Sequence, residues 1–403
     1  MINRLRGRAG VCLIWLITRG IVIGYALTPH AIHRATGPNR DVSLYEYWTK
    51  LIADGSFPAH DVRWQYPPLA GPVLGLARLF PGDYFHGFVF LSLLIDLVVL
   101  LLLLRSKDRL AGAWVWTLGL FMLGSTTYLR YDVLVTLPAV AALLALPRER
   151  LFGALAAIGA LMKIWPILLM LALPRDRRLF RAGAVFAGVC AVVLGLGELY
   201  ASNMWSFVHN QGGRGMEIEA VAATPFQIAR VFGWHASARY RYGSMQVVAP
   251  AADNVAAWCI FATLIGLALV AYAAWRRSPA TWTPAIGCDI ALAAVLVSVV
   301  TSRVLSPQYL IWLIGVGAVC LTRADTRMRL PVLMIVLAVP LTFLNFPWLW
   351  HHLLTANALN VAILTARNAL LLAATLLAIK RIWPTTGRRA RAKTPEQKAV
   401  TTA

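Results

Sequence analysis

Long apolar runs of about twenty residues recur along the chain and alternate with short polar stretches. A run of this length spans the apolar core of a bilayer when it folds as a helix. The runs do not show the ten-residue alternation of apolar and polar positions that a transmembrane β-barrel requires. The pattern therefore predicts an all-α polytopic membrane protein with about twelve transmembrane helices.

The order of these stretches predicts one membrane domain over residues 1–380. Its first span is expected from Gly10 to Thr28 and opens into a first outer loop at 29–68. A second outer loop is expected at 201–253, and both loops should carry short amphipathic helices. Residues 381–403 read as a basic, disordered cytoplasmic tail.

Two local patterns refine this outline. Residues 42–53 predict an amphipathic helix at the membrane interface, with Leu44, Tyr47, Trp48 and Leu51 along its apolar face. The apolar stretch 151–173 is basic at both ends. Because proline interrupts helices, Lys163-Ile164-Trp165-Pro166 should break that stretch into two half-length helices.

Charge sets the expected orientation. Only 14% of residues are charged, yet the formal net charge is +21. Most basic residues form short clusters between apolar runs, which is typical of cytoplasmic loops. Arg4, Arg6 and Arg8 precede the first span. The N- and C-termini are therefore expected in the cytoplasm, and the sequence carries no nucleic-acid-binding motif.

The first outer loop concentrates acids and aromatics between Asp41 and Pro68. Asp41 follows the first span closely, where an acceptor could approach from outside. A carboxylate there can act as a general base on a hydroxyl. The alternative is that Asp41 only caps the helix at 42–53, since aspartate is a favoured N-cap.

Four basic residues suit a phosphate group: Arg303, Arg214, Lys163 and Arg130. Arginine offers a planar fork of donors and lysine a point charge. The alternative is pairing within the membrane, for example of Arg130 with Asp132. Arg367 is expected to pair with an acid or the backbone, and Asp96 and Asp289 to make structural contacts between helices.

Other residue types give weaker signals. The five cysteines form no CxxC pair, and His209, His351 and His352 lack metal-ligand spacing. No cofactor is therefore predicted, and a divalent metal is left open. The aromatics Trp48, Trp64, Tyr66, Trp348 and Trp350 could stack on sugar rings or serve as an interfacial belt.

Several motifs occur in a distinctive order along the chain. They are the acidic first loop ending in Tyr66-Pro67-Pro68, Arg130-Tyr131-Asp132, Lys163-Ile164-Trp165-Pro166, the RGMEIEA loop at 214–220, and Ser306-Pro307-Gln308-Tyr309. In this order they resemble glycosyltransferase family 87 of the GT-C superfamily, over roughly residues 10–375. This family is common in actinobacteria and includes polyprenyl-phosphomannose-dependent mannosyltransferases and related arabinofuranosyltransferases.

The resemblance implies a GT-C-type helical bundle that takes a sugar from a polyprenyl phosphate on the outer face of the plasma membrane. The family's first-loop aspartate maps to Asp41, which would be the base. The expected substrate-binding residues are Glu46, Tyr66, His209, Glu217, Glu219, Gln308 and Tyr309. Some members carry histidines shortly after the Ser-Pro turn, whereas this chain has Gln308 and Tyr309 there.

The resemblance thus implies an enzyme of cell-wall biosynthesis that transfers mannose to a glycolipid or polysaccharide acceptor. One base and an in-line leaving group imply inversion at the anomeric carbon. The expected partners are the polyprenyl-phosphate-sugar donor, that acceptor and membrane lipids, without nucleic acid. Two alternatives stay open: an arabinofuranosyltransferase, and a transporter or flippase of a lipid-linked sugar.

Overall fold

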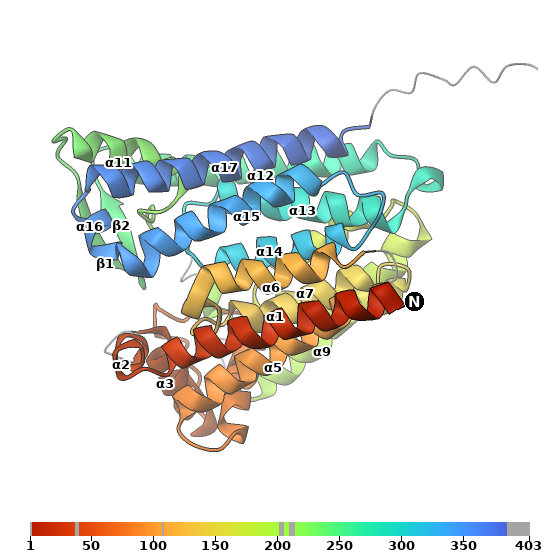
Figure 1. The fold of residues 1–403 in the computed structure, drawn as a ribbon, viewed down its shortest axis with the longest axis horizontal. Helices are drawn as coiled ribbons and strands as arrows, with labels where there is room; N and C mark the ends of the chain where they lie inside the picture. Colours follow the sequence, from red (N-terminus) through yellow and green to blue (C-terminus); the bar gives the residue numbers. More distant parts are fainter. Residues whose placement is uncertain (1, 37–39, 107–108, 201–204, 209–213, 385–403) are drawn as a thin grey trace, which may run out of the picture.

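The structure is a computed structural model that describes residues 2–36, 40–106, 109–200, 205–208 and 214–384. Most helices run side by side through one bundle, and short helices and a β-hairpin gather at one end of it (Figure 1).

In chain order the elements are α1 (Ile2–Ala26), α2 (Pro29–Thr36), α3 (Asp41–Ala53), α4 (Ala70–Gly75), η1 (Leu76–Leu79), α5 (Tyr84–Leu104), α6 (Ala111–Leu123), η2 (Gly124–Thr127), α7 (Asp132–Leu144), α8 (Glu149–Met162), η3 (Trp165–Ala172), α9 (Arg177–Tyr200), η4 (Val221–Ala223), α11 (Thr224–Val231), β1 (Ser237–Arg241), β2 (Ser244–Val248), α12 (Ala252–Trp275), η5 (Pro279–Thr281), α13 (Pro284–Val300), α14 (Tyr309–Leu321), α15 (Arg329–Phe343), η6 (Leu344–Trp348), α16 (Trp350–Leu354) and α17 (Ala358–Ile382).

Six helical segments within the described residues are long and apolar enough to cross a membrane. They are Gly7–Ala26, Tyr84–Leu104, Arg177–Leu199, Ala252–Trp275, Arg329–Trp348 and Ala358–Ile382. This confirms a mainly helical, membrane-embedded protein. Twelve complete crossings are not confirmed, because α7 and α14 have only 13 residues each. Such a helix is about 20 Å long, against roughly 30 Å of hydrocarbon.

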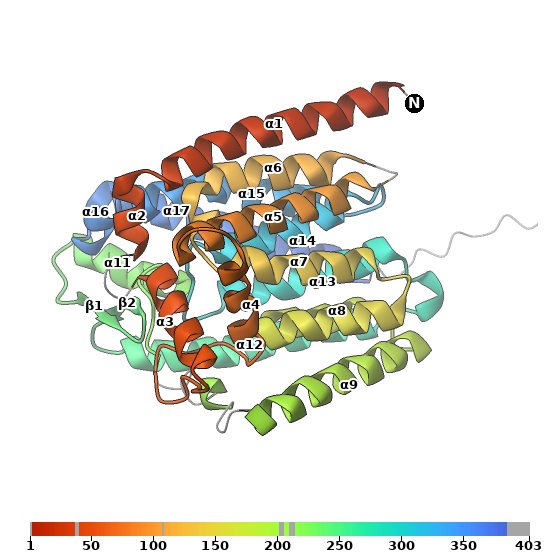
Figure 2. The same ribbon diagram turned by 90° about the horizontal axis from the view of Figure 1, so that it is seen from below.

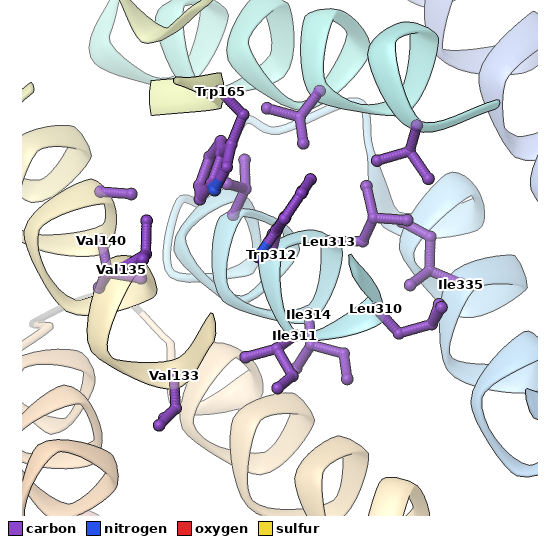
Figure 3. Close-up of a cluster of buried hydrophobic side chains, with 14 of the residues drawn as sticks. Val133, Val135, Val140, Trp165, Leu310, Ile311, Trp312, Leu313, Ile314 and Ile335 are labelled. Carbon is purple, nitrogen blue, oxygen red and sulfur yellow. The ribbon is translucent and has the colours of Figure 1, made fainter. Parts of the chain in front are cut away.

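Helix α14 lies at the centre of the bundle, and most of its side chains are buried. Figure 3 shows its residues Leu310 to Ile314 among side chains of α7, η3 and α15. Helix α6 approaches α14 closely at Gly112, where a Cβ atom would come within 2.2 Å of the Ala318 carbonyl oxygen. A small residue at such a crossing lets two membrane helices pack backbone to backbone.

A buried carboxylate joins the N-terminal helices. Asp96 in α5 accepts hydrogen bonds from Trp15 Nε1 (3.0 Å), Arg19 Nε (2.8 Å), Trp116 Nε1 (2.7 Å) and the Tyr128 hydroxyl (2.7 Å). These donors come from α1, α6 and the turn after η2. Both charges of the Arg19–Asp96 pair are almost fully buried. The network thus satisfies a charge that would be costly at membrane depth, in the structural role expected for Asp96.

The apolar stretch 151–173 breaks where its sequence predicts. Helix α8 ends at Met162, and the 3₁₀ helix η3 begins at Trp165. The two segments pack against each other, which keeps the basic residues at their outer ends on the same side of the bundle. The prediction of two half-length helices at Lys163–Pro166 is confirmed.

Two loop predictions need correction. The helix after the first span is present as α3, but it buries Val42, Tyr45, Trp48 and Thr49, while Tyr47 is 50% exposed. The expected interfacial face was wrong because α3 packs inward, with the Tyr45 ring 5.4 Å from Phe88 of α5. The second loop also contains the antiparallel β1–β2 hairpin, where only helices were expected.

The predicted basic tail lies mostly outside the described residues and stays a prediction. Helix α17 continues to Ile382, two residues beyond the expected domain boundary at 380. Residues 385–403 lie outside the described part of the chain.

Replacing Asp96 with asparagine should lower the free energy of unfolding by about 3 kcal/mol or more, because the buried Arg19 guanidinium loses its counter-charge. Thermal unfolding in detergent, followed by tryptophan fluorescence, measures this. The control is Asp176→Asn, which removes a solvent-accessible partner of Arg178 and should cost less than about 1 kcal/mol. Equal stability of Asp96→Asn and wild type would contradict the structural role.

Candidate active site

Helix α3 and the β1–β2 hairpin lie at the same end of the bundle (Figure 2). Residues of both line a cavity of about 550 Å³. Its walls come from both outer loops and from the ends of α7, α8 and α14. The lining residues that matter below are Arg40, Asp41, Trp48, Arg63, Gln65, Tyr66, Arg130, Lys163, Arg214, Glu217, Glu219, Tyr240, Tyr242, Arg303, Ser306, Gln308, Tyr309, Phe346 and Trp350.

The cavity collects ten of the twelve site residues expected from the sequence. They are Asp41, Tyr66, Arg130, Lys163, Arg214, Glu217, Glu219, Arg303, Gln308 and Tyr309. Glu46 lies elsewhere: it faces away from the buried side of α3 and pairs with Lys50 at 2.6 Å. Glu46 is therefore not among the residues that line this cavity. His209 lies outside the described residues.

Asp41 is the first residue of α3, and its carboxylate forms an ion pair with Arg130. Arg40 occupies the N-cap position without a side-chain cap, so the capping alternative for Asp41 is not observed. The guanidinium of Arg130 also lies over the Phe346 ring, 5.7 Å from its centroid. These contacts hold the Asp41 carboxylate at the cavity wall, where it is about one-third exposed.

Lys163 follows the last residue of α8, and its ammonium group is surrounded by aromatic side chains. Its Nζ donates to Asp132 Oδ1 at 2.6 Å and lies 4.8 Å from the centroid of the Trp312 ring. Asp132 also accepts from Trp312 Nε1 at 2.6 Å. Asp132 therefore pairs with Lys163. Lys163 and Arg130 both have acidic partners, as the pairing alternative expected, although Arg130 pairs with Asp41 and not with Asp132.

The rings around Asp41 and Lys163 form one cluster. The Tyr66 ring lies 5.4 Å from Tyr131 and 6.3 Å from Tyr45, both nearly edge-on. Trp48 contacts Trp64 in the same way at 5.1 Å. Edge-to-face pairs at such distances are favourable beyond the area they bury. The first loop is thereby packed firmly against the start of α7.

The loop at 214–220 is held by three neighbours. The Glu217 amide donates to the Arg303 carbonyl at 2.9 Å, and the Ser306 hydroxyl donates to the Glu217 carboxylate at 3.0 Å. The Ile218 amide donates to the Met245 carbonyl of β2 at 3.0 Å. The loop, the hairpin and the turn before α14 thus form one wall of the cavity.

Helix α17 holds the same loop from behind. Arg367 Nη2 donates to the Glu219 carbonyl at 3.1 Å and to its Oε1 at 3.3 Å. The neighbouring Asn368 Nδ2 donates to Thr224 Oγ1 at 2.7 Å. All four residues are buried, which confirms that Arg367 pairs with an acid in the bundle.

Burial changes the acid–base properties of this wall. It raises the pKa of Glu219 from its ordinary value of 4.5 to about 8, although Arg367 opposes the shift. Burial also raises the pKa of Glu217, against the opposing effects of Arg214 and the Ser306 hydroxyl. Burial lowers the pKa of Arg303, and the nearby charge of Arg214 lowers it further.

The lining as a whole favours an anionic ligand. Six lining residues are basic and three are acidic: Arg40, Arg63, Arg130, Lys163, Arg214 and Arg303 against Asp41, Glu217 and Glu219. Because cations crowded in a partly buried space repel one another, an anion among them gains strong charge-assisted hydrogen bonds. Within the described residues no three histidine, cysteine or carboxylate side chains lie close enough to hold a metal ion.

Comparison with known proteins identifies the family. A family model for glycosyltransferase family 87 matches residues 64–307, more than half of the chain. The chain belongs to glycosyltransferase family 87. This confirms the resemblance seen in the sequence and makes the protein a membrane glycosyltransferase, with a sugar donor and an acceptor as substrates. No curated protein matches the chain.

The family match covers four of the six basic residues of the cavity, because Arg40 and Arg63 precede the matched segment. Lys163, Arg214 and Arg303 lie inside the matched segment, whereas Asp41 precedes it and Tyr309 follows it. The geometry alone places Asp41 and Tyr309 in the same cavity as the matched residues.

Some lining residues were not singled out from the sequence. They are Arg40, Arg63, Tyr240, Tyr242 and Phe346. The alternating SARYRYGSMQVV segment at 237–248, with its Tyr-Gly pair, carried a hairpin signal that would have pointed to the tyrosines. Of the aromatics considered for sugar stacking, Trp48, Tyr66 and Trp350 line the cavity.

The raised pKa of Glu219 predicts a pH-dependent stability. Folding favours its protonated form, so its contribution is complete below the unfolded pKa near 4.5 and is lost as the pH rises through about 8. The melting temperature in detergent should therefore fall from neutral to mildly alkaline pH, and less steeply in Glu219→Gln. The exposed-site variant Glu46→Gln should keep the wild-type slope. An unchanged slope in Glu219→Gln would contradict the assignment.

Proposed function

We propose that this cavity transfers mannose from a polyprenyl-phosphate donor to a hydroxyl group of a glycolipid or polysaccharide acceptor, with inversion at the anomeric carbon. The observation that carries the proposal is that a carboxylate and several basic side chains line the same cavity. A carboxylate, Asp41, stands at one wall, and the cations Lys163, Arg214 and Arg303 line the same cavity.

The reaction needs one proton transfer and one displacement. Asp41 takes the proton of the acceptor hydroxyl, and the oxygen attacks the anomeric carbon of the donor sugar. The bond from that carbon to the phosphate oxygen breaks, and the lipid phosphate leaves with the electron pair. The transition state is oxocarbenium-like, and the cations stabilise the charge that develops on the phosphate.

An apolar groove beside the cavity supports a lipid-linked donor. It encloses about 380 Å³ between α4, η1, α5, α7 and α8. Its lining residues are Val73, Leu76, Leu91, Ile95, Leu134, Leu137, Pro138, Ala141, Leu155, Ile158 and Met162. Met162 lines the groove, and the next residue, Lys163, lines the cavity. An isoprenoid chain in the groove would bring its phosphate to Lys163.

The distribution of basic residues supports an extracytoplasmic site. The N-terminal end of α1 and the C-terminal end of α17 both lie at the end of the bundle opposite the hairpin (Figure 1). Basic residues at helix ends there include Arg105, Arg148, Arg177, Arg276, Arg277, Lys380 and Arg381. By the positive-inside rule that end faces the cytoplasm, so the cavity faces outward across the plasma membrane.

Replacing Asp41 with asparagine should reduce sugar transfer by about 10²- to 10⁴-fold, since the amide cannot accept the proton. Transfer of labelled mannose from polyprenyl-phosphate mannose in detergent measures this. Glu46→Gln on the same helix is the matched control and should keep wild-type activity. Normal transfer by a folded Asp41→Asn protein would refute the base assignment.

The same assay separates the competing functions. Transfer of arabinofuranose in preference to mannose would replace the proposed donor sugar. A transporter of lipid-linked sugar would transfer neither sugar in detergent, because its activity needs a sealed vesicle.

The groove predicts a dependence on the length of the lipid. Ala141→Trp on α7 should fill the groove and raise the KM for a long-chain polyprenyl-phosphate donor, with little effect on a short-chain analogue. Ala191→Trp on α9 is the control, because Ala191 is exposed outside the groove. Equal effects of Ala141→Trp on both donors would contradict binding of the tail there.

A further inference from the structure

The turn of the β1–β2 hairpin has an unusual residue at its tip. Arg241 pairs with Ser244, which leaves Tyr242 and Gly243 as a two-residue turn with φ values of 49° and 78°. Such turns favour Asn-Gly, because both central residues need positive φ. A bulky side chain rarely adopts that conformation, and strain of this kind concentrates at functional sites. The tyrosine at position 242 is therefore not explained by turn geometry.

The hairpin is fixed at the mouth of the cavity. Strand β2 pairs with the 216–218 segment through the Val247 amide, which donates to the Met216 carbonyl at 2.9 Å. Gln65 Nε2 of the first loop donates to the Tyr242 carbonyl at 3.3 Å. The turn is thus held from both outer loops, and Figure 2 shows the hairpin at the same end of the bundle as α3.

Two tyrosines of this hairpin line the cavity while staying open to solvent. Tyr240 is 52% exposed and Tyr242 is 39% exposed. Burial raises the pKa of Tyr240, and the Asp41 carboxylate raises it further, so the Tyr240 hydroxyl lies within electrostatic reach of that carboxylate. An exposed tyrosine offers an apolar ring face and a hydroxyl that both donates and accepts hydrogen bonds.

These features distinguish the mouth of the cavity from its lipid side. Lys163 is surrounded by the rings of Tyr66, Tyr309 and Trp312 and adjoins the apolar groove. Tyr240 instead lies within electrostatic reach of Asp41, the proposed base, which must face the acceptor hydroxyl, and Tyr242 lies on the same hairpin and lines the same cavity. A ring bound against them would therefore be on the acceptor side.

We propose that Tyr240 and Tyr242 form the acceptor subsite and that it binds a sugar ring of a saccharide acceptor, with Tyr242 stacked on the ring. This inference rests on the proposed function, since it assumes that Asp41 faces the acceptor. It goes further by naming the side chains that bind a sugar ring of the acceptor.

The decisive variant is Tyr242→Asn, because asparagine suits the positive φ of the turn while the ring is lost. We expect a melting temperature at or above that of wild type. The KM for a mannobiose glycoside acceptor should rise about threefold to tenfold, as the loss of an aromatic contact predicts. The KM for the polyprenyl-phosphate donor and the rate with an alkyl alcohol acceptor should stay unchanged.

Two further variants serve as controls. Tyr242→Phe keeps the ring, so its KM for the acceptor should equal that of wild type. Phe232→Asn removes an aromatic side chain from the same loop that is 84% exposed and outside the cavity lining, so it should have no effect. An unchanged acceptor KM in Tyr242→Asn, or an equal rise in the donor KM, would overturn the acceptor subsite.

A second measurement separates this inference from the proposed function. If wild type transfers no sugar from any polyprenyl-phosphate donor, the proposed function fails while the subsite can still be examined by binding. Saturation-transfer NMR with mannobiose should then show weaker signals for Tyr242→Asn than for wild type. Equal signals from the two proteins would overturn the subsite as well.

Discussion

Two ion pairs between distant segments of the chain hold the site together. Arg130 and Asp132 are near neighbours in sequence, yet each pairs with a distant segment: Arg130 with Asp41 of α3, and Asp132 with Lys163 after α8. Charges at this depth need partners, so these pairs bind the first loop and the broken helix to one short turn. The proposed base, Asp41, and a proposed phosphate-binding cation, Lys163, are thereby both positioned by this turn. The remaining cations and the hairpin line the rest of the cavity.

The sequence was most informative about features that depend only on residues close together in the chain. Apolar runs predicted the membrane helices, proline predicted the break after Met162, and the expense of charge in a membrane singled out Asp41, Lys163 and Arg303 before any geometry was known. These arguments need only neighbouring residues. Together with the motifs that resemble the family, they located ten residues that line the cavity, although the roles of those residues stay predictions.

What the sequence could not predict depends on contacts between distant segments. The partner of Arg130 is settled by how α3 docks, and Asp132 was the plausible choice only because it is close in sequence. The buried face of α3 was misjudged because Tyr45 packs on α5, and no property of the helix itself indicates this. The short helices α7 and α14 were likewise not predicted from the sequence, and the cavity lies at the ends where both helices begin.

The carboxylate of Asp96 also affects the position of Asp41 relative to the membrane. Arg19 and Trp15 attach α1 to that carboxylate, and α1 leads through α2 into α3. A slip of α1 by one helical turn would shift the following segments by about 5.4 Å, enough to separate Asp41 from Arg130. The buried network therefore fixes the position of α1 along its axis, and with it the height of the proposed base, Asp41, relative to the membrane.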